Sequence, residues 1–133
     1  SGKIITAFDI LRVLALGANA CYSARGMMMS LGCIQALQCD SGKCPVGIAT
    51  QDKRLYRGID ISDKRVRVYN FHQNTMKAVV ELMEACGFKS LMHVTAKSFH
   101  RRITRSETRS LQEIYFNDRP GFKDQNEMLS YMN

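Results

Sequence analysis

The chain has 133 residues, 45% of them apolar, so it can bury a modest core but is too short for a complete (β/α)8 barrel, which typically needs about 250 residues. Its formal charge of +7, from 19 Lys and Arg against 12 Asp and Glu, admits a polyanionic partner, although a basic surface that only solvates the fold is the simpler interpretation. It contains no run of about 20 apolar residues and no leader peptide, so we expect a cytoplasmic protein without a membrane span.

The N-terminal part of the chain is predicted to form a helix followed by a short strand. Thr6 and Asp9 form a capping box around the start of the apolar run Phe8–Leu16, and Gly17 supplies a stop at its C-terminal end. The next segment, Ala20–Tyr22, is small, apolar and soon followed by a new turn. This pattern favours a short buried strand.

A second helix and a long loop come next. Residues Ser23–Gly26 lead into a helix through Met27–Leu31, and Gly32 breaks that helix. From Cys33 to Gln51 the sequence is rich in turn residues and is predicted as a loop. A helix, a strand and a helix in this order are typical of a piece of an α/β barrel.

The rest of the chain is predicted to be helical. A long helix over Ser62–Cys86 carries a continuous apolar stripe and ends at Gly87. Two shorter helices are expected after Thr95 and after Ser106, and the tail from Asn117 has only weak periodicity. We therefore expect two parts, residues 1–52 with the last barrel units and residues 53–133 as a helical extension.

Three of the five cysteines lie close together in the predicted loop. Cys33, Cys39 and Cys44 have the spacing C-x5-C-x4-C, and Pro45 follows the last of them. Three thiolates on a glycine-containing loop can surround one small iron–sulfur cluster, and bacterial ferredoxin motifs also end in Cys-Pro. Zinc usually takes four ligands at closer spacing, and the nearest histidine, His72, lies far downstream on a predicted helix. Zinc and three unligated cysteines remain the alternatives.

The residues around these cysteines closely resemble the cluster loop in the large chain of glutamate synthase. The resemblance is carried by Leu31–Cys39 and Lys43–Gln51, while Phe71–Thr75 and the helix after it are similar to the stand-alone flavin domains related to that enzyme. It covers about the first two thirds of the chain. It implies that the three loop cysteines bind a [3Fe–4S] cluster.

The start of the chain is similar to the phosphate-binding segments of FMN-dependent barrels. The order of residues resembles that of the α-hydroxy-acid oxidases in Ser1–Ile5, at Asp9 and in Ala24–Gly26. Two positions differ, because Lys3 and Ala24 each stand where those enzymes have a glycine. In such barrels a ligand phosphate lies between loops and a helix N-terminus. The resemblance implies that the FMN phosphate is bound by Gly2, Lys3, Ala24, Arg25 and Gly26.

As a whole, the resemblance implies an α/β fold, namely the C-terminal portion of a (β/α)8 TIM barrel, mostly helical as a fragment and with a cysteine cluster loop. The parent would be an oxidoreductase acting on CH–NH2 donors that forms L-glutamate from 2-oxoglutarate and ammonia or glutamine-derived nitrogen, by reduction of 2-iminoglutarate. Its partners would be the upstream barrel segment and an electron donor, either ferredoxin or an NAD(P)H-dependent subunit. No catalytic residue is assigned, and the fragment alone is expected to be almost inactive.

Two functions of other classes remain open. One is a redox-free helical module for protein contacts, and the other is a basic nucleic-acid-binding module. Nucleic acid is the less favoured partner, because base-stacking aromatic residues are not interleaved with the basic ones. A single barrel strand leaves apolar helix surface uncovered, so we also expect self-association, most simply as a symmetric dimer through Phe8–Leu16 and Ala20–Tyr22.

Overall fold

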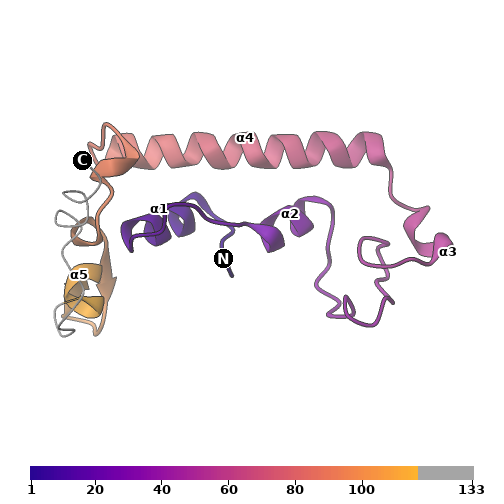
Figure 1. Ribbon diagram of the computed structural model, residues 1–133, viewed down its shortest axis with the longest axis horizontal. Helices are drawn as coiled ribbons and strands as arrows, with labels where there is room; N and C mark the ends of the chain where they lie inside the picture. Colours follow the sequence, from indigo (N-terminus) through magenta and orange to yellow (C-terminus); the bar gives the residue numbers. More distant parts are fainter. Residues whose placement is uncertain (117–133) are drawn as a thin grey trace. The chain divides into compact units, whose positions relative to one another are not determined.

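Helices account for most of the regular structure in residues 1–116, which also contain one two-stranded sheet. The computed structural model describes residues 1–116. The chain divides into two units: unit 1 contains Ser1–Ala7 and Tyr22–Val80, and unit 2 contains Phe8–Cys21 and the chain from Glu81 onward. In chain order, the elements are α1 Ala7–Ala15, α2 Ala24–Ser30, α3 Lys53–Tyr56, α4 Ile61–Ala85, the 3-10 turns η1 Leu91–His93 and η2 Ala96–Ser98, β1 His100–Arg102, β2 Thr108–Ser110 and α5 Leu111–Tyr115 (Figure 1).

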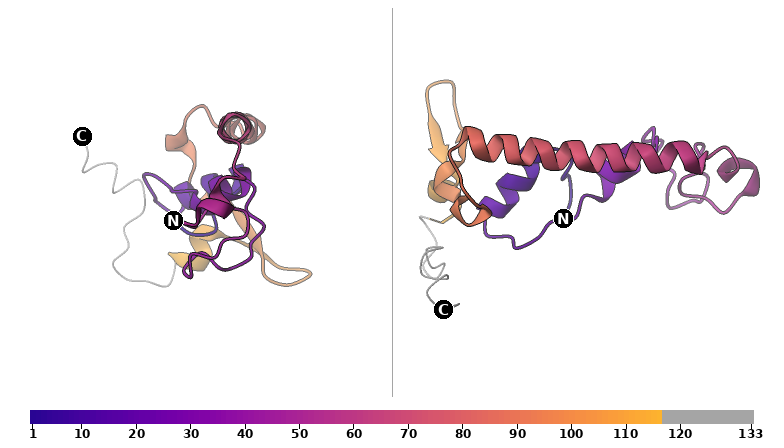
Figure 2. Two further views of the ribbon diagram at one scale, coloured as in Figure 1. Left: turned by 90° about the vertical axis from the view of Figure 1, so that its right-hand side faces the viewer. Right: turned by 90° about the horizontal axis from the view of Figure 1, so that it is seen from above.

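The helices predicted over residues 8–16 and 62–86 are confirmed as α1 and α4. Each ends in a Schellman motif, in which a glycine with positive φ lets the next amides turn back to the last carbonyls. In α1 the Gly17 amide donates to the Leu14 carbonyl at 2.9 Å, and the Ala18 amide donates to the Val13 carbonyl at 3.2 Å. Gly87 ends α4 in the same way, and α4 runs unbroken between its two ends (Figure 2).

The apolar stripe predicted on the long helix is confirmed in its main part. Val79 is buried, and the half-buried positions follow a spacing of three or four residues, as expected for one face of a helix. These positions are Val68, Phe71, Thr75, Leu82 and Met83. Two members of the predicted stripe, Met76 and Cys86, are exposed instead.

The strand predicted at Ala20–Tyr22 is wrong. These residues are irregular, and Tyr22 is 76% exposed. The only sheet among residues 1–116 pairs β1 with β2. A strand needs a neighbour to satisfy its amides and carbonyls, and this segment finds none in the described part of the chain.

The helix predicted after Thr95 is present only as the short 3-10 helix η2, after which the chain forms an antiparallel hairpin. In this hairpin His100 pairs with Ser110, and Arg102 pairs with Thr108. The helix predicted after Ser106 exists as α5 but begins only at Leu111, after the second strand of the hairpin. A capping box starts it, in which Ser110 and Glu113 exchange side-chain and backbone hydrogen bonds.

Unit 2 encloses a small apolar core of its own. The rings of Phe8 and Phe99 have centroids 5.5 Å apart, and the Leu111 amide donates to the Phe99 carbonyl at 2.7 Å. The buried apolar residues of this unit are Leu11, Ala15, Val94, Ala96, Phe99 and Leu111. Helix α1 and the hairpin segment therefore belong to one structural unit, which sequence order alone does not suggest.

Within residues 1–116, no helix has both the length and the apolar character needed to cross a membrane. The predicted tail from Asn117 lies outside the described residues. The predicted division between residues 1–52 and 53–133 concerns parts of a larger parent and stays a prediction.

Candidate functional site

The first cysteine of the predicted cluster loop is held directly by the end of α2. Gly32 has a φ of 102°, and its amide donates to the Met29 carbonyl at 2.9 Å. The next amide, that of Cys33, donates to the Met28 carbonyl at 3.1 Å. This Schellman motif makes Cys33 the first residue of the loop and ties its backbone to the helix.

The last cysteine is the best enclosed of the three. Cys44 is only 7% exposed, and its carbonyl accepts the Gly47 amide at 3.2 Å. This bond closes a β-turn with Pro45 in the position that proline favours. The turn places the backbone amides that follow Cys44 around its sulfur. The hydrogen bond from the Ala49 amide lowers the pKa of the Cys44 thiol most, and the amides of residues 46–48 lower it further, whereas burial raises it. The turn therefore favours a thiolate, the form that binds metal.

Gly47, one of the turn residues of the predicted loop, is required by the packing of this turn. A Cβ at Gly47 would lie 2.5 Å from the Leu55 carbonyl oxygen and 2.9 Å from the Tyr56 Cα of α3. Its φ of 80° adds conformational strain for any other residue. The close approach of backbone to backbone fixes the cysteine turn against α3.

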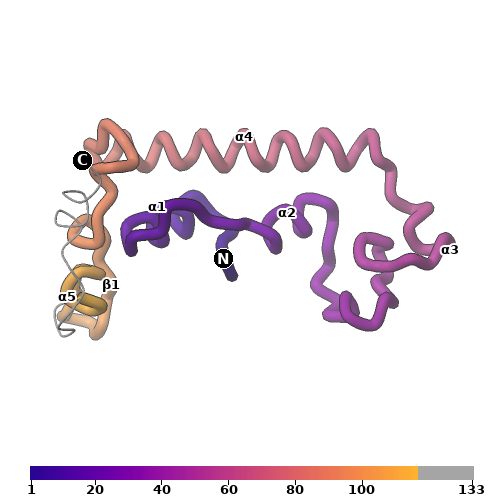
Figure 3. The backbone as a smooth tube through the Cα atoms, in the orientation of Figure 1, coloured from indigo at the N-terminus to yellow at the C-terminus, as the bar shows by residue number. Residues whose placement is uncertain are grey.

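The loop between the outer cysteines is irregular (Figure 3). Cys33 is half-buried and Cys39 is exposed, and the Gln35 amide donates to the Cys33 sulfur at 3.4 Å. Gln35 and Leu37 both have positive φ, at 57° and 56°. Such backbone outliers cluster at functional sites, so they support a functional role for this loop.

The three thiols lie on one loop but do not converge on a single point. In the described part of the chain, no three His, Cys, Asp or Glu side chains are placed to hold one metal ion. An all-cysteine donor set with amides around one sulfur is of the kind that holds iron–sulfur clusters. The cluster on these three cysteines stays a prediction.

The predicted phosphate-binding residues lie on two segments that a hydrogen bond joins. The Ser23 hydroxyl, just before α2, donates to the Ile4 carbonyl at 2.7 Å. Ser23 therefore makes no side-chain cap to α2, and the first amides of the helix keep no intrahelical partner. Ala24 and Arg25, both exposed, thus lie near the segment that carries Gly2 and Lys3.

The backbone of this segment explains why glycine is expected there. Gly2 and Lys3 have φ values of 92° and 53°, both in the left-handed region. Lys3 occupies the position where the oxidases have a second glycine, and it adopts the same type of conformation at some conformational cost. Both residues are exposed.

Gly26 has a packing role that is visible in the structure. It is buried, and a Cβ there would lie 2.6 Å from the Ser23 hydroxyl oxygen and 3.2 Å from Phe71 Cζ. Gly26 therefore allows α2 to approach α4 closely within unit 1. Its predicted contact with phosphate stays a prediction.

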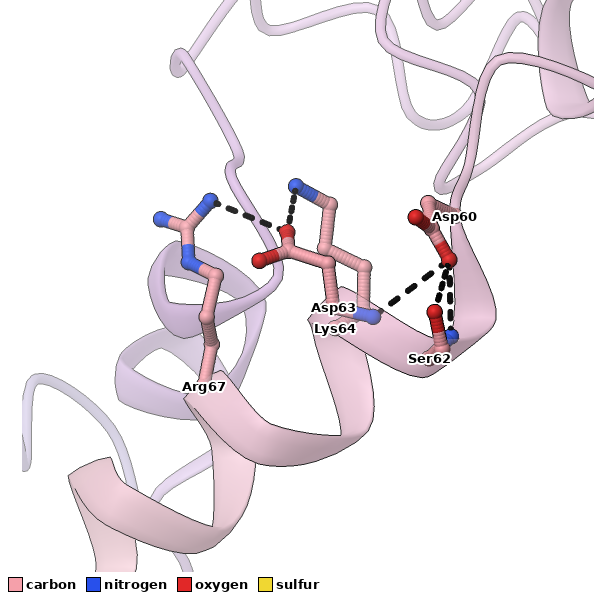
Figure 4. A network of polar contacts seen from close by, with 5 residues as sticks. All are labelled: Asp60, Ser62, Asp63, Lys64 and Arg67. Atoms are coloured by element: carbon pink, nitrogen blue, oxygen red, sulfur yellow. Dashed lines mark hydrogen bonds and ion pairs between the residues drawn. The ribbon is translucent and has the colours of Figure 1, made fainter.

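Sequence reasoning missed a polar network at the start of α4. The Asp60 carboxylate accepts the Ser62 hydroxyl at 2.6 Å and the Ser62 amide at 2.9 Å (Figure 4). The hydrogen bond from the Ser62 hydroxyl is the main reason why the pKa of Asp60 is lowered. Asp63 then pairs with Lys64 at 3.1 Å and with Arg67 at 4.0 Å. The signal in the sequence is an Asp two residues before a Ser at a helix start, followed by a basic cluster.

Comparisons with known proteins find a matching family model and relatives that align with most of this chain. A family model described as a conserved region in glutamate synthase matches residues 1–89. The chain is 41% identical over 93 residues to the glutamate synthase large subunit-like protein YerD of Bacillus subtilis, covering 70% of this chain and 18% of the relative. It is 35% identical over 91 residues to an archaeal glutamate synthase [NADPH] of Methanocaldococcus jannaschii, covering 68% of this chain and 18% of the relative.

A third relative is much longer than the other two. The glutamate synthase [NADPH] large chain of Azospirillum brasilense is 31% identical over 98 residues, which is 73% of this chain and 6% of the relative. The chain therefore spans less than a fifth of the length of these relatives. No solved structure matches it.

Proposed function

This chain belongs to the glutamate synthase family, and we propose that it forms the cluster-binding and flavin-phosphate-binding end of an FMN and iron–sulfur oxidoreductase. The relatives that it matches are much longer, since the aligned part of the chain spans 18% of two of them and 6% of another. We therefore expect the remainder of the enzyme, including a (β/α)8 TIM barrel of which this chain is the C-terminal portion, in the parent protein.

The observation that carries the proposal is the environment of Cys44. Its sulfur is buried in a turn whose amides point to it and lower the thiol pKa. Amide hydrogen bonds to sulfur are one of the means by which proteins hold and tune iron–sulfur clusters. With Cys33 tied to α2 and Cys39 exposed on the same loop, the three thiols would hold a [3Fe–4S] cluster.

The bond between Ser23 and Ile4 supports the flavin part of the proposal. It joins the segment containing Gly2 and Lys3 to the uncapped start of α2. Backbone amides there would donate hydrogen bonds to the phosphate of FMN, and the Arg25 guanidinium would add a charge-assisted hydrogen bond. Arg25 makes no ion pair or hydrogen bond within residues 1–116, so its donors are available.

The proposed reaction of the parent is the reductive formation of L-glutamate from 2-oxoglutarate and ammonia or glutamine-derived nitrogen. When bound, the flavin would supply hydride chemistry and the cluster single-electron transfer. The residues of this chain would hold both groups and exclude water from the buried thiol. Residues that bind the oxo acid would lie upstream, so the chain alone would have little or no activity.

The electron donor and the cellular setting are part of the same proposal. The names of the relatives include NADPH-dependent glutamate synthases and, at 32% identity over 98 residues, a ferredoxin-dependent one from Pyropia yezoensis. We therefore propose ferredoxin or an NAD(P)H-dependent subunit as the donor, in the cytoplasm. The upstream barrel segment would be the main structural partner.

The experiment that tests this proposal is anaerobic reconstitution of the chain with iron and sulfide. We expect the iron and sulfide content of one cluster and broad absorption in the visible range, and we expect both to be lost in Cys39→Ser. Cys86→Ser is the matched control, because Cys86 is exposed and lies after α4, outside the loop. Tight zinc binding with no iron in the wild-type chain would overturn the proposal.

A further inference from the structure

Two cationic side chains of α4 lie at the turn that carries the first cluster cysteine. Lys64 Nζ lies 3.7 Å from the position that a Cβ on Gly32 would occupy, and Arg67 Nη1 lies 3.8 Å from it. Gly32 directly precedes Cys33, whose amide closes the same turn. The ammonium group of Lys64 and the guanidinium group of Arg67 thus lie beside the turn that leads into Cys33, a predicted cluster ligand. They come from α4, whereas the turn ends α2.

Interactions at the start of α4 hold these two charged groups in place. Asp60 accepts the amides of Ser62 and Asp63, at 2.9 Å and 3.4 Å, which fixes the first turn of the helix. Asp63 Oδ2 then lies 3.1 Å from Lys64 Nζ and 4.0 Å from Arg67 Nη1 (Figure 4). The Lys64 side chain is only 23% exposed, which is low for a lysine.

The charged atoms nearest this turn are both cationic. Apart from the chain neighbours of Gly32, Lys64 Nζ and Arg67 Nη1 are the only atoms of the described residues within 4 Å of the Gly32 Cβ position, whereas the carboxylates of Asp60 and Asp63 lie farther from it. A cluster bound by three thiolates is anionic, and it becomes more anionic when it accepts an electron. A nearby positive charge therefore favours the reduced state, because opposite charges attract.

We propose that Lys64 and Arg67 set the reduction potential of the cluster by stabilising its reduced form. This inference rests on the proposed function, because it requires a cluster on Cys33. In the step concerned, one electron passes from an external one-electron donor to the cluster. No bond to Lys64 or Arg67 forms or breaks, and neither side chain gives or takes a proton.

The test is a mediated redox titration of the reconstituted chain, followed by visible absorption. Lys64→Gln and Arg67→Gln are each expected to make reduction less favourable by up to about tenfold in the equilibrium constant, which is ~59 mV for a one-electron couple. Asp63→Asn should shift the potential in the opposite direction, because it removes the opposing charge. A role limited to packing would not give shifts of opposite sign.

Three further variants separate this electrostatic role from a structural one. Arg65→Gln removes the same charge from the same turn of α4, but its side chain does not lie within 4 Å of the Gly32 position, so we expect a much smaller shift. Lys64→Arg and Arg67→Lys keep the charge and should keep the potential. If a glutamine variant fails to hold the cluster while the charge-preserving one holds it, the charge requirement is supported.

The outcomes distinguish this inference from the proposed function. If the wild-type chain takes up no cluster, the proposed function fails and the inference fails with it. If all variants hold the cluster at the wild-type potential, only the inference is overturned. Loss of the cluster in the charge-preserving variants as well would also overturn it, because packing would then be the role of these side chains.

Discussion

Gly47 lies three residues after the last cysteine of the loop, and its amide closes the turn around that cysteine. The turn surrounds the Cys44 sulfur with amides, and it can do so only because Gly47 approaches the backbone of α3 without a side chain. The geometry of the cluster loop therefore depends on a residue that ligates nothing.

We expect Gly47→Ala to reduce the cluster content of the reconstituted chain although all cysteines remain. The new Cβ would lie 2.5 Å from the Leu55 carbonyl oxygen, so the turn must move away from α3. Iron and sulfide per chain measure the effect. Gly42→Ala is the control: Gly42 also has a positive φ, 69°, but open space around it, so this change carries only the left-handed cost of about 1–2 kcal/mol. Equal cluster content in both variants would argue against this view of the turn.

A substitution of one residue, Arg25, also tests the proposed flavin site. The proposed function assigns part of the FMN site to upstream barrel strands of the parent, so the measurement uses a form extended through those strands. In this form we expect Arg25→Ala to weaken FMN binding by about 1–3 kcal/mol, the range for losing a charge-assisted hydrogen bond. Fluorescence titration gives the dissociation constant. An unchanged value would remove Arg25 from the site.

At the scale of elements, the start of α4 depends on one carboxylate. Asp60 accepts the Ser62 hydroxyl and amide as well as the Asp63 amide, and these hydrogen bonds lower the pKa of Asp60 in the folded chain. A group whose folded pKa is lowered stabilises the fold above its unfolded pKa, about 3.9 for Asp, and loses this contribution as the pH falls through the folded pKa.

We therefore expect Asp60→Ala to lower the melting temperature of the chain at pH 7 and to have a progressively smaller effect below about pH 4. Thermal unfolding followed by circular dichroism at several pH values measures both. Asp40→Ala is the control, because Asp40 is an exposed loop carboxylate with no hydrogen bond or ion pair in the described residues. An effect of Asp60→Ala that stays constant down to pH 2 would contradict the assignment.

At the scale of the whole molecule, the chain exposes apolar side chains on its helices. Phe8 on α1 is half-exposed, and so are residues on α4 that include Val66, Tyr69 and Val80. Large apolar patches on monomers tend to be covered by association. In the parent, the upstream segment would cover part of this surface.

We expect the isolated chain to self-associate, most simply as a symmetric dimer, with α4 as its most protected element. Sedimentation equilibrium measures the association, and hydrogen exchange measures the protection. Helix α4 should be protected most because its capped start and Schellman end close a long, continuous hydrogen-bond ladder. A compact monomer at tens of micromolar, protected most strongly around Cys21, would contradict both parts of the prediction.

The sequence by itself was sufficient for the features that depend on local order. The cysteine motif identified the family, and the comparisons confirm it. Helices α1 and α4 were placed within one residue, because a helix hydrogen-bonds its own turns and a glycine ends it. The predicted cluster and phosphate ligands come from the same local signals and remain to be tested.

Only the tertiary structure decided the features that join distant segments. Ala20–Tyr22 is no strand because its pairing would have to come from elsewhere, whereas His100–Arg102 is one because Thr108–Ser110 turns back to it. The position of Lys64 and Arg67 beside Gly32 likewise depends on how α2 and the start of α4 pack. Local sequence patterns specify which hydrogen bonds a segment can make within itself. The packing of the chain decides which segment pairs with a strand and which residues lie next to a charged side chain.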